Sequence, residues 1–333
     1  MTAAAASWSG ARALVTGAGG FIGSHLVERL AREGADVVAF TRYTSQSKRG
    51  LLEMVPAEIL EKVQVIRGDI RDADAVESAV RGADYVFHLA ALVGIPYSFL
   101  HPTEVFDVNT MGTLNVLNAA RGSSPQRVVI TSTSEVYGTA RYVPIDEKHP
   151  LQAQSPYAAS KIGSDAAGIS FFRAYGLPVV VVRPFNAFGP RQSDRAVIPT
   201  IIAQALTKDR VRLGNLDATR DFTFVTDTVA GFLAAASASV YGRPLNIGSG
   251  FEISIGEVAQ RIIALTGSAA PLEVDAERLR PEGGEVDRLW CDSTLARELL
   301  GWQPEVSLDE GLQKAIAWVS EFRDLYTPDR YAI

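Results

Sequence analysis

The sequence has little of what marks secreted, metal-binding or nucleic-acid-binding proteins. Cys291 is its only cysteine, so no intramolecular disulfide can form, and a reducing compartment fits. The four histidines show no spacing typical of metal ligands, so we expect no metal site. Lysine and arginine number 32 against 38 aspartates and glutamates. The resulting net charge of −6 argues against a nucleic acid or an anionic membrane as the main partner.

Long apolar runs are missing as well. No run approaches the roughly 20 apolar residues that a membrane-spanning helix needs. The N-terminal stretch MTAAAASWSG has no basic segment followed by a long apolar core. We therefore expect a cytoplasmic protein without a signal peptide. The hydrophobic content of 47% is enough for a sizeable core.

Short β-branched runs alternate with helical patterns through about residue 185. The runs are almost continuously apolar, which is typical of parallel strands buried on both faces: ARALVTG, ADVVAF, VQVIRG, DYVFHLA, RVVITS and LPVVVVRP. Helices are expected between them, at residues 21–33, 72–81, 102–121 and 156–175. This alternation predicts an α/β fold with a Rossmann-type, doubly wound parallel sheet.

The regular alternation weakens after about residue 185. Helices are expected at residues 198–207, 226–239, 254–266 and 308–322, with loops and short strands between them. We expect residues 1–185 to form the sheet domain. Residues 186–333 would form mainly a smaller C-terminal α/β lobe that binds substrate, with the chain crossing between the lobes more than once.

A glycine-rich loop, TGAGGFIGSHL, follows the first predicted strand and opens the first helix. Gly17, Gly20 and Gly23 allow a tight turn and a close backbone approach to a pyrophosphate at the N-terminus of the helix. Because the context is right on both sides, the loop predicts a dinucleotide site in the sheet domain. Phe21 and Ile22, in the first helical turn, belong to the expected contacts.

The second predicted strand would end in an acidic residue if it held an unmodified adenosine ribose, but it ends in Arg42. Arginine can accommodate a 2′-phosphate, so the residues favour NADP slightly over NAD. The alternative for Arg42 is a solvated surface position. Asp69, after the third strand, either approaches the adenine edge or forms a helix-capping turn.

SPYAASK places Tyr157 and Lys161 four residues apart, on one face of a helix for which Ser155 is a plausible N-cap. A neighbouring ammonium would lower the pKa of the tyrosine and make it usable as a base near neutral pH. The lysine could also hold the nicotinamide ribose. On its own, such spacing is usually a surface pair. It becomes specific together with the glycine loop.

The motifs TGAGGFIG, GDI, HLAA, VNTMGT, STSEVYG, YAASK and RPFNAFGPR occur in an order that resembles the extended short-chain dehydrogenases/reductases, of the nucleotide-sugar epimerase/dehydratase kind. The resemblance covers nearly the whole chain. It implies that Thr133 and Tyr157 contact the reacting sugar hydroxyl and that Lys161 binds the cofactor ribose. It also implies cofactor contacts from Ile70, Leu89, Ala90, Ala91 and Pro184, a supporting hydrogen-bond role for Asn109, and a sugar-phosphate contact from Asn186.

STSEVYG puts Glu135 just beyond a buried strand, where a carboxylate is costly to desolvate. The side chain is either solvated on the loop or takes part in chemistry. Simple 4-epimerases of the family usually have a small residue there. The Thr-Ser-Glu sequence is similar to that of GDP-mannose 4,6-dehydratases and of UDP-glucuronate decarboxylases.

This similarity implies a 4,6-dehydratase that converts an NDP-hexose or NDP-N-acetylhexosamine to the 4-keto-6-deoxy sugar. C4 is oxidised while Tyr157 takes the hydroxyl proton, and Glu135 then removes the C5 proton. Water leaves C6 with help from Glu135 or Ser134, and hydride returns to C6. The cofactor would therefore stay tightly bound and be recycled.

Substrate contacts are expected mainly from the C-terminal part. Arg191, Arg220 and Arg280 are candidates for gripping pyrophosphate or nucleotide ribose, because guanidinium groups suit phosphate oxygens. Each is equally suited to a structural ion pair. Further candidates are Val197, Asn215, which would touch the base, and Glu285.

Alternatives remain beside the dehydratase. A UDP-glucuronate decarboxylase would share Thr133, Glu135, Tyr157 and Lys161, and an NDP-sugar 4-epimerase would use Glu135 differently. The intact Tyr157/Lys161 pair argues against a non-catalytic NAD(P)-binding protein. The apolar faces of the helices at 102–121 and 156–175 resemble the dimer interface common in this family, which implies a homodimer.

Overall fold

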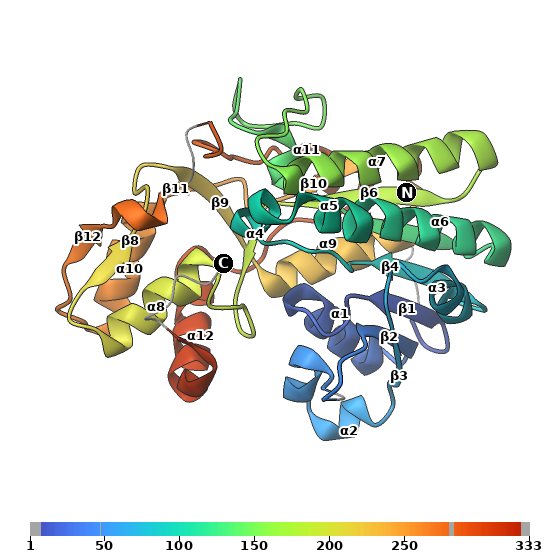
Figure 1. The fold of residues 1–333 in the computed structure, drawn as a ribbon, viewed down its shortest axis with the longest axis horizontal. Coiled ribbons are helices and arrows are strands. Elements are labelled where there is room, and N and C mark those ends of the chain that lie inside the picture. The colour runs from blue at the N-terminus through green and yellow to red at the C-terminus, as the bar shows by residue number, and fades with distance from the viewer. Residues whose placement is uncertain (1–7, 47, 280–282, 328–333) are drawn as a thin grey trace.

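A computed structural model describes residues 8–46, 48–279 and 283–327. Seven parallel strands form one sheet in the order β10-β6-β5-β4-β1-β2-β3 (Figure 1). Their bounds are β1 (Arg12–Thr16), β2 (Asp36–Arg42), β3 (Gln64–Gly68), β4 (Tyr85–His88), β5 (Arg127–Thr131), β6 (Val179–Pro184) and β10 (Pro244–Ile247). The strand order reverses between β1 and β4. The predicted α/β fold with a doubly wound parallel sheet is confirmed.

Helices cover both faces of this sheet, and alternate strand residues feed two separate cores. Val15 of β1 packs with α1 (Phe21–Arg32), α9 (Val225–Ser237) and α11 (Thr294–Leu300). Leu14 packs on the other face with α3 (Ala73–Val80), α6 (Gly112–Ser123) and α7 (Pro156–Tyr175). This period of two explains why the strand sequences are apolar at nearly every position.

Helix α7 has the predicted bounds because both of its ends are encoded locally. The Ser155 side chain accepts a hydrogen bond from the backbone N–H of Ala158, and Gly176 ends the helix at φ +69°. The single helix expected at 102–121 is instead α5 (Pro102–Phe106), a π-helical segment η2 (Asp107–Met111) and α6. Elements that were not predicted include α2 (Ala57–Leu60), α4 (Ile95–Leu100), α11, and the 3-10 segments η1 (Gly50–Met54), η3 (Ser134–Tyr137), η4 (Ala276–Arg278) and η5 (Arg323–Leu325).

A smaller lobe with its own apolar core lies beside the carboxyl edge of the large sheet, at the left of Figure 1. It contains a three-stranded sheet, a two-stranded sheet and three helices: β7 (Asn186–Phe188), β9 (Thr219–Phe224) and β11 (Glu252–Ser254); β8 (Val211–Leu213) and β12 (Leu272–Val274); α8 (Val197–Thr207), α10 (Ile255–Thr266) and α12 (Leu308–Glu321). Two elements that lie between these in sequence belong to the large domain instead. Strand β10 is part of the large sheet, and helix α9 packs in the core on one face of it. Among the described residues, none of the helices has the length and apolar character to cross a bilayer.

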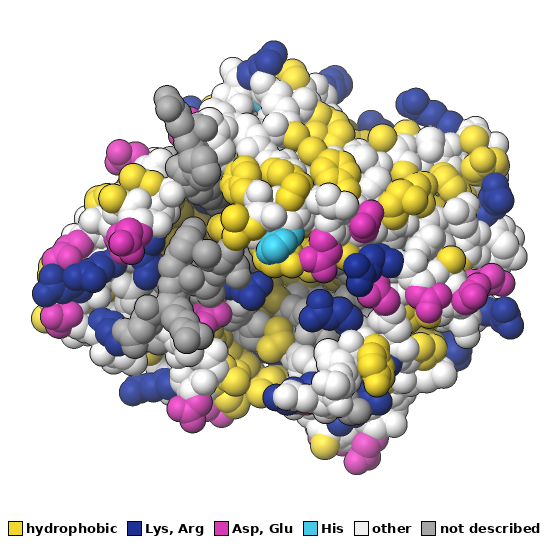
Figure 2. Space-filling model, viewed as in Figure 1, with side chains coloured by type: hydrophobic (Ala, Val, Ile, Leu, Met, Phe, Trp, Pro, Cys, Tyr) yellow, Lys and Arg dark blue, Asp and Glu magenta, His cyan; other side chains and the backbone are white. Residues whose placement is uncertain are grey.

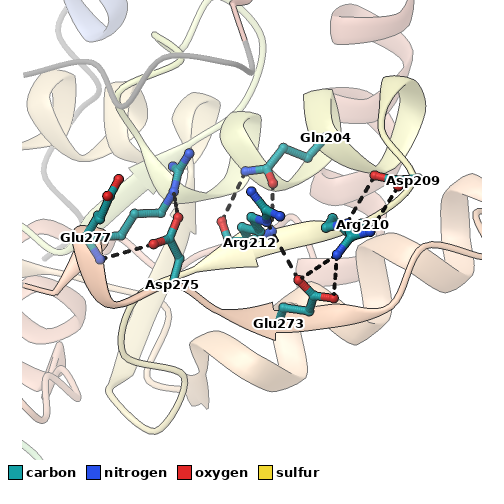
Figure 3. Close-up of polar contacts among 8 residues, drawn as sticks. Gln204, Asp209, Arg210, Arg212, Glu273, Asp275 and Glu277 are labelled. Carbon is teal, nitrogen blue, oxygen red and sulfur yellow. Dashed lines mark hydrogen bonds and ion pairs between the residues drawn. The ribbon is translucent and has the colours of Figure 1, made fainter.

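Polar contacts hold the outer edge of the smaller lobe (Figure 3). The side-chain amide of Gln204 accepts from the N–H of Arg212 at 2.7 Å and donates to its C=O at 3.2 Å, and so pairs with strand β8 as a backbone neighbour would. On β12, Glu273 pairs with Arg210 at 3.2 Å. Asp275 then accepts from the backbone of Glu277. The N–H of Asp275 also donates to the C=O of Leu213 at 2.7 Å, and an added Cβ at Gly214 would lie 2.5 Å from the Arg278 oxygen, so η4 packs against the loop that follows β8.

Candidate active site

The glycine loop lies where the strand order reverses, against the segment that follows β4. Gly17 has φ +68°, and a Cβ there would lie 2.7 Å from the backbone N of Ala90. A Cβ at Gly23 would lie 2.2 Å from the Gly17 oxygen. Gly20 is the N-cap of α1 and provides no side-chain cap, and the first turn carries no acidic residue. An uncapped helix N-terminus behind a close-packed glycine turn fits the pyrophosphate of a dinucleotide.

The side chains of the first helical turn pack inward on both sides. Phe21 contacts the core of the smaller lobe, and Ile22 contacts the core under the large sheet. Their backbone N–H groups are therefore the atoms available to a ligand. Leu89 and Ala90 lie against Gly17 of the glycine loop, and their N–H groups bond to Thr16 Oγ1 at 3.2 Å. Ala91 is the next residue along the chain.

Thr133, Ser134 and Glu135 follow β5 and are all buried. Thr133 caps η3, and its hydroxyl accepts from the N–H of Glu135 at 3.2 Å. Glu135 is 9% exposed, so it is not solvated on a loop. It lies close enough to Tyr157 for its charge to act on that phenol. The structure thus brings the predicted carboxylate and the predicted base together.

Tyr157 and Lys161 occupy successive turns of α7, and both are buried. Burial raises the pKa of Tyr157; a hydrogen bond with Thr133 lowers it, while the charges of Glu135 and Asp165 raise it. The net shift of the Tyr157 pKa is therefore upward, because burial disfavours the phenolate, and not downward as expected from Lys161. Burial lowers the pKa of Lys161 to about 8, and Asp165 acts in the opposite direction.

Asn109 lies in the π-helical segment and joins three parts of the site. Its side chain accepts from the N–H of Leu92 at 2.8 Å and donates to the C=O of Leu92 at 3.0 Å. It also donates to Ser160 Oγ at 2.9 Å, and Ser160 donates to the C=O of Tyr157 at 2.7 Å. Asn109 therefore supports the turn of α7 that carries Tyr157.

His88, at the end of β4, is part of the same frame. Its ring nitrogens contact Thr16 Oγ1 at 2.8 Å and Thr113 Oγ1 at 3.0 Å. Burial lowers the pKa of His88 to about 3, and the charge of Lys161 adds to this. His88 is therefore neutral near pH 7 and acts as a structural link between β1, β4 and α6.

On the substrate side, two predicted residues pair with one another. Arg220 is 5% exposed and forms an ion pair with Glu285 at 3.0 Å. Asn186, at the start of β7, has a buried Oδ1 atom with no hydrogen-bond partner among the described residues. The side-chain Oδ1 atom of Asn215 accepts from the N–H of Asp217 at 2.9 Å, in the loop that follows β8. Pro184 is the last residue of β6, and Val197 is the first residue of α8. Arg280 lies outside the described residues.

Arg191 makes a structural ion pair with only part of its guanidinium. Its guanidinium turns toward α1, where it pairs with Glu28 at 2.5 Å and donates to the C=O of Met54 at 3.3 Å. Its backbone has φ +66°, which is uncommon for a side chain larger than glycine. Its Nε and Nη1 atoms are buried without a hydrogen-bond partner among the described residues, so a phosphate contact from Arg191 stays a prediction beside the ion pair.

Comparison with known proteins agrees with this geometry. The sequence model of a family described as GDP-mannose 4,6 dehydratase matches residues 14–315. This chain belongs to the NAD-dependent epimerase/dehydratase family. A UDP-glucose 4-epimerase of Mycolicibacterium smegmatis is 36% identical over 92% of this chain and 97% of its own. A UDP-N-acetyl-alpha-D-glucosaminuronate decarboxylase of Bacillus cytotoxicus is 35% identical over 94% and 99%.

The fold comparison points to a third activity of the family. A dTDP-glucose 4,6-dehydratase from Streptomyces venezuelae, solved with NAD bound, matches 95% of this chain and 99% of its own with a TM-score of 0.86 at 31% identity. The chain is accordingly an NAD-dependent enzyme that modifies nucleotide sugars. Its relatives divide among epimerases, decarboxylases and dehydratases at similar identity.

The preference for NADP has no support from these family members. Arg42 is exposed at the end of β2, and the related dehydratase holds NAD. Asp69 is engaged by Arg71, which donates to it at 2.6 and 2.9 Å and lowers the pKa of the carboxyl. The backbone N–H of Arg71 also donates to Asp69 at 2.9 Å, while the side chain that caps the following helix is that of Asp72.

Sequence reasoning missed two features of this family member. The N–H of Leu51 donates to the Gly19 oxygen at 2.9 Å, and a Cβ at Gly50 would lie 2.5 Å from that oxygen, so the 49–51 segment closes over the glycine loop. The second feature is a buried ion pair of Asp165 with Arg183 at 2.9 Å. The recurrence of polar residues at 157, 161 and 165 was the signal that could have revealed Asp165.

Proposed function

We propose that this enzyme is a nucleotide-sugar 4,6-dehydratase that uses NAD and acts on an NDP-hexose or NDP-N-acetylhexosamine. The observation that supports this reaction is the burial of Glu135 beside Tyr157 at the end of β5. A carboxylate is costly to bury, and a plain 4-epimerase has no step that needs a second base.

The chain's own residues divide the proton transfers. Bound NAD supplies the exchange of hydride with C4 and later C6 of the sugar. Tyr157, hydrogen-bonded with Thr133, takes the proton of the 4-hydroxyl, and Glu135 removes the C5 proton that the 4-ketone makes acidic. Ser134 or the protonated Glu135 helps water to leave C6. Lys161 would hold the nicotinamide ribose.

The smaller lobe would hold the nucleotide part. Asn186 offers a buried polar group without a partner among the described residues, and Arg220 offers a guanidinium that Glu285 holds in place. Both are on strands of the small sheet, β7 and β9, next to the carboxyl edge of the large one. Pyrophosphate would then lie between the two lobes.

The test is to incubate purified protein with GDP-, UDP- and dTDP-linked hexoses, N-acetylhexosamines and uronic acids in deuterium oxide, and to weigh the products. We expect loss of one water from a single substrate class, with deuterium at C5. Loss of carbon dioxide from a uronic acid would instead identify a decarboxylase. An isomer of unchanged mass, without deuterium at C5, would identify a 4-epimerase.

A further inference from the structure

Helix α7 carries a third ionisable group on the face that presents Tyr157 and Lys161. Asp165 follows Lys161 by four residues, one turn further along. It is 1% exposed, and Arg183 on β6 donates to its Oδ2 atom at 2.9 Å. Neither residue has a part in the proton transfers proposed above. A fully buried ion pair needs such close geometry to offset its desolvation cost.

Arg183 connects this pair to the segment that carries Glu135. Its Nη1 atom donates to the Tyr137 hydroxyl at 2.9 Å, and Tyr137 belongs to the same short helix, η3, as Ser134 and Glu135. The Tyr137 hydroxyl in turn donates to Asn246 Oδ1 on β10 at 2.6 Å. Burial raises the pKa of the Asp165 carboxyl, and the charge of Arg183 acts in the opposite direction. Asp165 thus lies at the junction of α7 and the end of β5.

Asp165 is also the anion that acts on the buried Lys161 ammonium. The other ionisable groups around Lys161 are His88 from β4, Arg183 from β6, Tyr157 on α7 and, beyond Tyr157, Glu135 from η3. His88 is neutral near pH 7, and Arg183 repels an ammonium. Burial lowers the pKa of Lys161 and Asp165 raises it, so Asp165 opposes the loss of the lysine proton.

We propose that Asp165, anchored by Arg183, is a positioning residue that keeps Lys161 protonated and fixes its place relative to Tyr157 and Glu135. The proposal rests on the proposed function, because it takes Lys161 to be the group that binds the nicotinamide ribose. It assigns Asp165 no contact with substrate or cofactor.

The experiment follows the titration of Lys161 directly. The ε-carbon NMR signal of Lys161, identified by its absence in Lys161→Met, is recorded against pH in the wild type and in Asp165→Asn. We expect the Lys161 midpoint in Asp165→Asn to fall by at least about one pH unit, since the variant removes a charge in a low-dielectric site. Asp165→Glu should restore most of the shift. An unchanged midpoint in Asp165→Asn would overturn the proposal.

A matched control makes the same chemical change elsewhere. Asp227 is a buried aspartate that caps the backbone N–H groups of Glu305 and Val306. Asp227→Asn should leave the Lys161 midpoint within a few tenths of a pH unit, and a shift equal to that of Asp165→Asn would mean a general loss of structure. If Asp165→Asn does not fold, Arg183→Gln provides the test. Because Arg183 anchors Asp165 and favours its ionised form, the loss of Arg183 should also lower the Lys161 midpoint, and a rise or no change would refute the proposal.

The test of Asp165 can succeed or fail independently of the proposed dehydratase reaction. The NMR titration needs no turnover, so it can succeed whichever product the substrate panel yields. Where turnover is measurable, the alkaline limb of the kcat profile should move in Asp165→Asn with the Lys161 midpoint. Normal dehydration together with an unshifted titration would reject the role of Asp165 alone.

Discussion

At the scale of single residues, Glu135 has the most direct influence on the proposed reaction. Its carboxylate is buried at the end of β5, beside Tyr157 and behind the cap that Thr133 provides. A carboxylate in such a place costs free energy that a glutamine of similar shape would avoid. Its presence there is therefore best explained by a proton transfer.

Replacing Glu135 by glutamine should remove the base while keeping the size of the side chain. We expect turnover and deuterium incorporation at C5 to fall by at least about a hundredfold, the usual contribution of a positioned base, while NAD binding, measured by calorimetry, persists. Glu147→Gln is the matched control, because Glu147 accepts a hydrogen bond from the N–H of Asn246 outside the site. Wild-type deuterium incorporation in Glu135→Gln would exclude this residue as the base.

The sequence motifs predicted which side chains belong to the site better than they predicted which residues those side chains contact. Tyr157 and Lys161 lie on successive turns of α7, as their spacing predicted, and the charge of the buried Glu135 acts on Tyr157. Arg191 was a candidate for phosphate or for a structural ion pair, and the sequence did not indicate that Glu28, on the first helix and far away in the sequence, is its partner. Such pairings depend on how distant segments pack, which composition and spacing do not contain.

At the scale of elements, the glycine loop and α1 are held by contacts that leave no room for a methyl group. Gly23 is a helical residue of α1 whose added Cβ would lie 2.2 Å from the Gly17 oxygen. Gly122 is a helical residue of α6 with nothing within 4 Å of an added Cβ. The two positions separate the effect of crowding from the general preference of helices for alanine.

Gly23→Ala should therefore displace the loop and weaken NAD binding, with a loss of about 1–3 kcal/mol in the free energy of unfolding. Gly122→Ala should instead gain about 0.5–1 kcal/mol, because alanine loses less backbone entropy in a helix. Urea unfolding and NAD calorimetry on both variants would measure this. Equal stability changes at the two positions would mean that the close approach at Gly23 does not constrain the loop.

Elements were predictable where their ends are encoded locally. Ser155 and Gly176 bound α7, and both act as residues of their type should. The π-helical segment Asp107–Met111 has no comparable signal, because the sequence there continues an ordinary helical pattern. It is the segment from which Asn109 reaches Leu92 and Ser160. An irregular helix at a functional position is a recurring exception to pattern-based prediction.

At the scale of the whole molecule, one face of the large domain carries exposed apolar side chains. Leu100, Phe106, Met111 and Tyr175 are each more than a third exposed, on α4, α5, η2 and α7. Figure 2 shows hydrophobic side chains gathered over these elements. Extended apolar surface of this kind is typical of a contact between proteins, so the homodimer expected from the sequence stays a prediction.

A charge placed in this face should separate the subunits if a second copy covers it. We expect the wild type to sediment as a dimer, and Phe106→Glu and Met111→Glu to weaken self-association by at least about a hundredfold, because an unpaired carboxylate would be buried in the contact. Leu265→Glu, on α10 of the smaller lobe, changes a side chain of similar exposure (41%, against 39% for Phe106) and should leave the dimer intact. A two-fold contact through α5 and α7 must respond to charges placed on those elements and not to charges on the smaller lobe. A wild-type monomer at micromolar concentration, or equal dissociation caused by Leu265→Glu, would therefore argue against this face as the dimer contact.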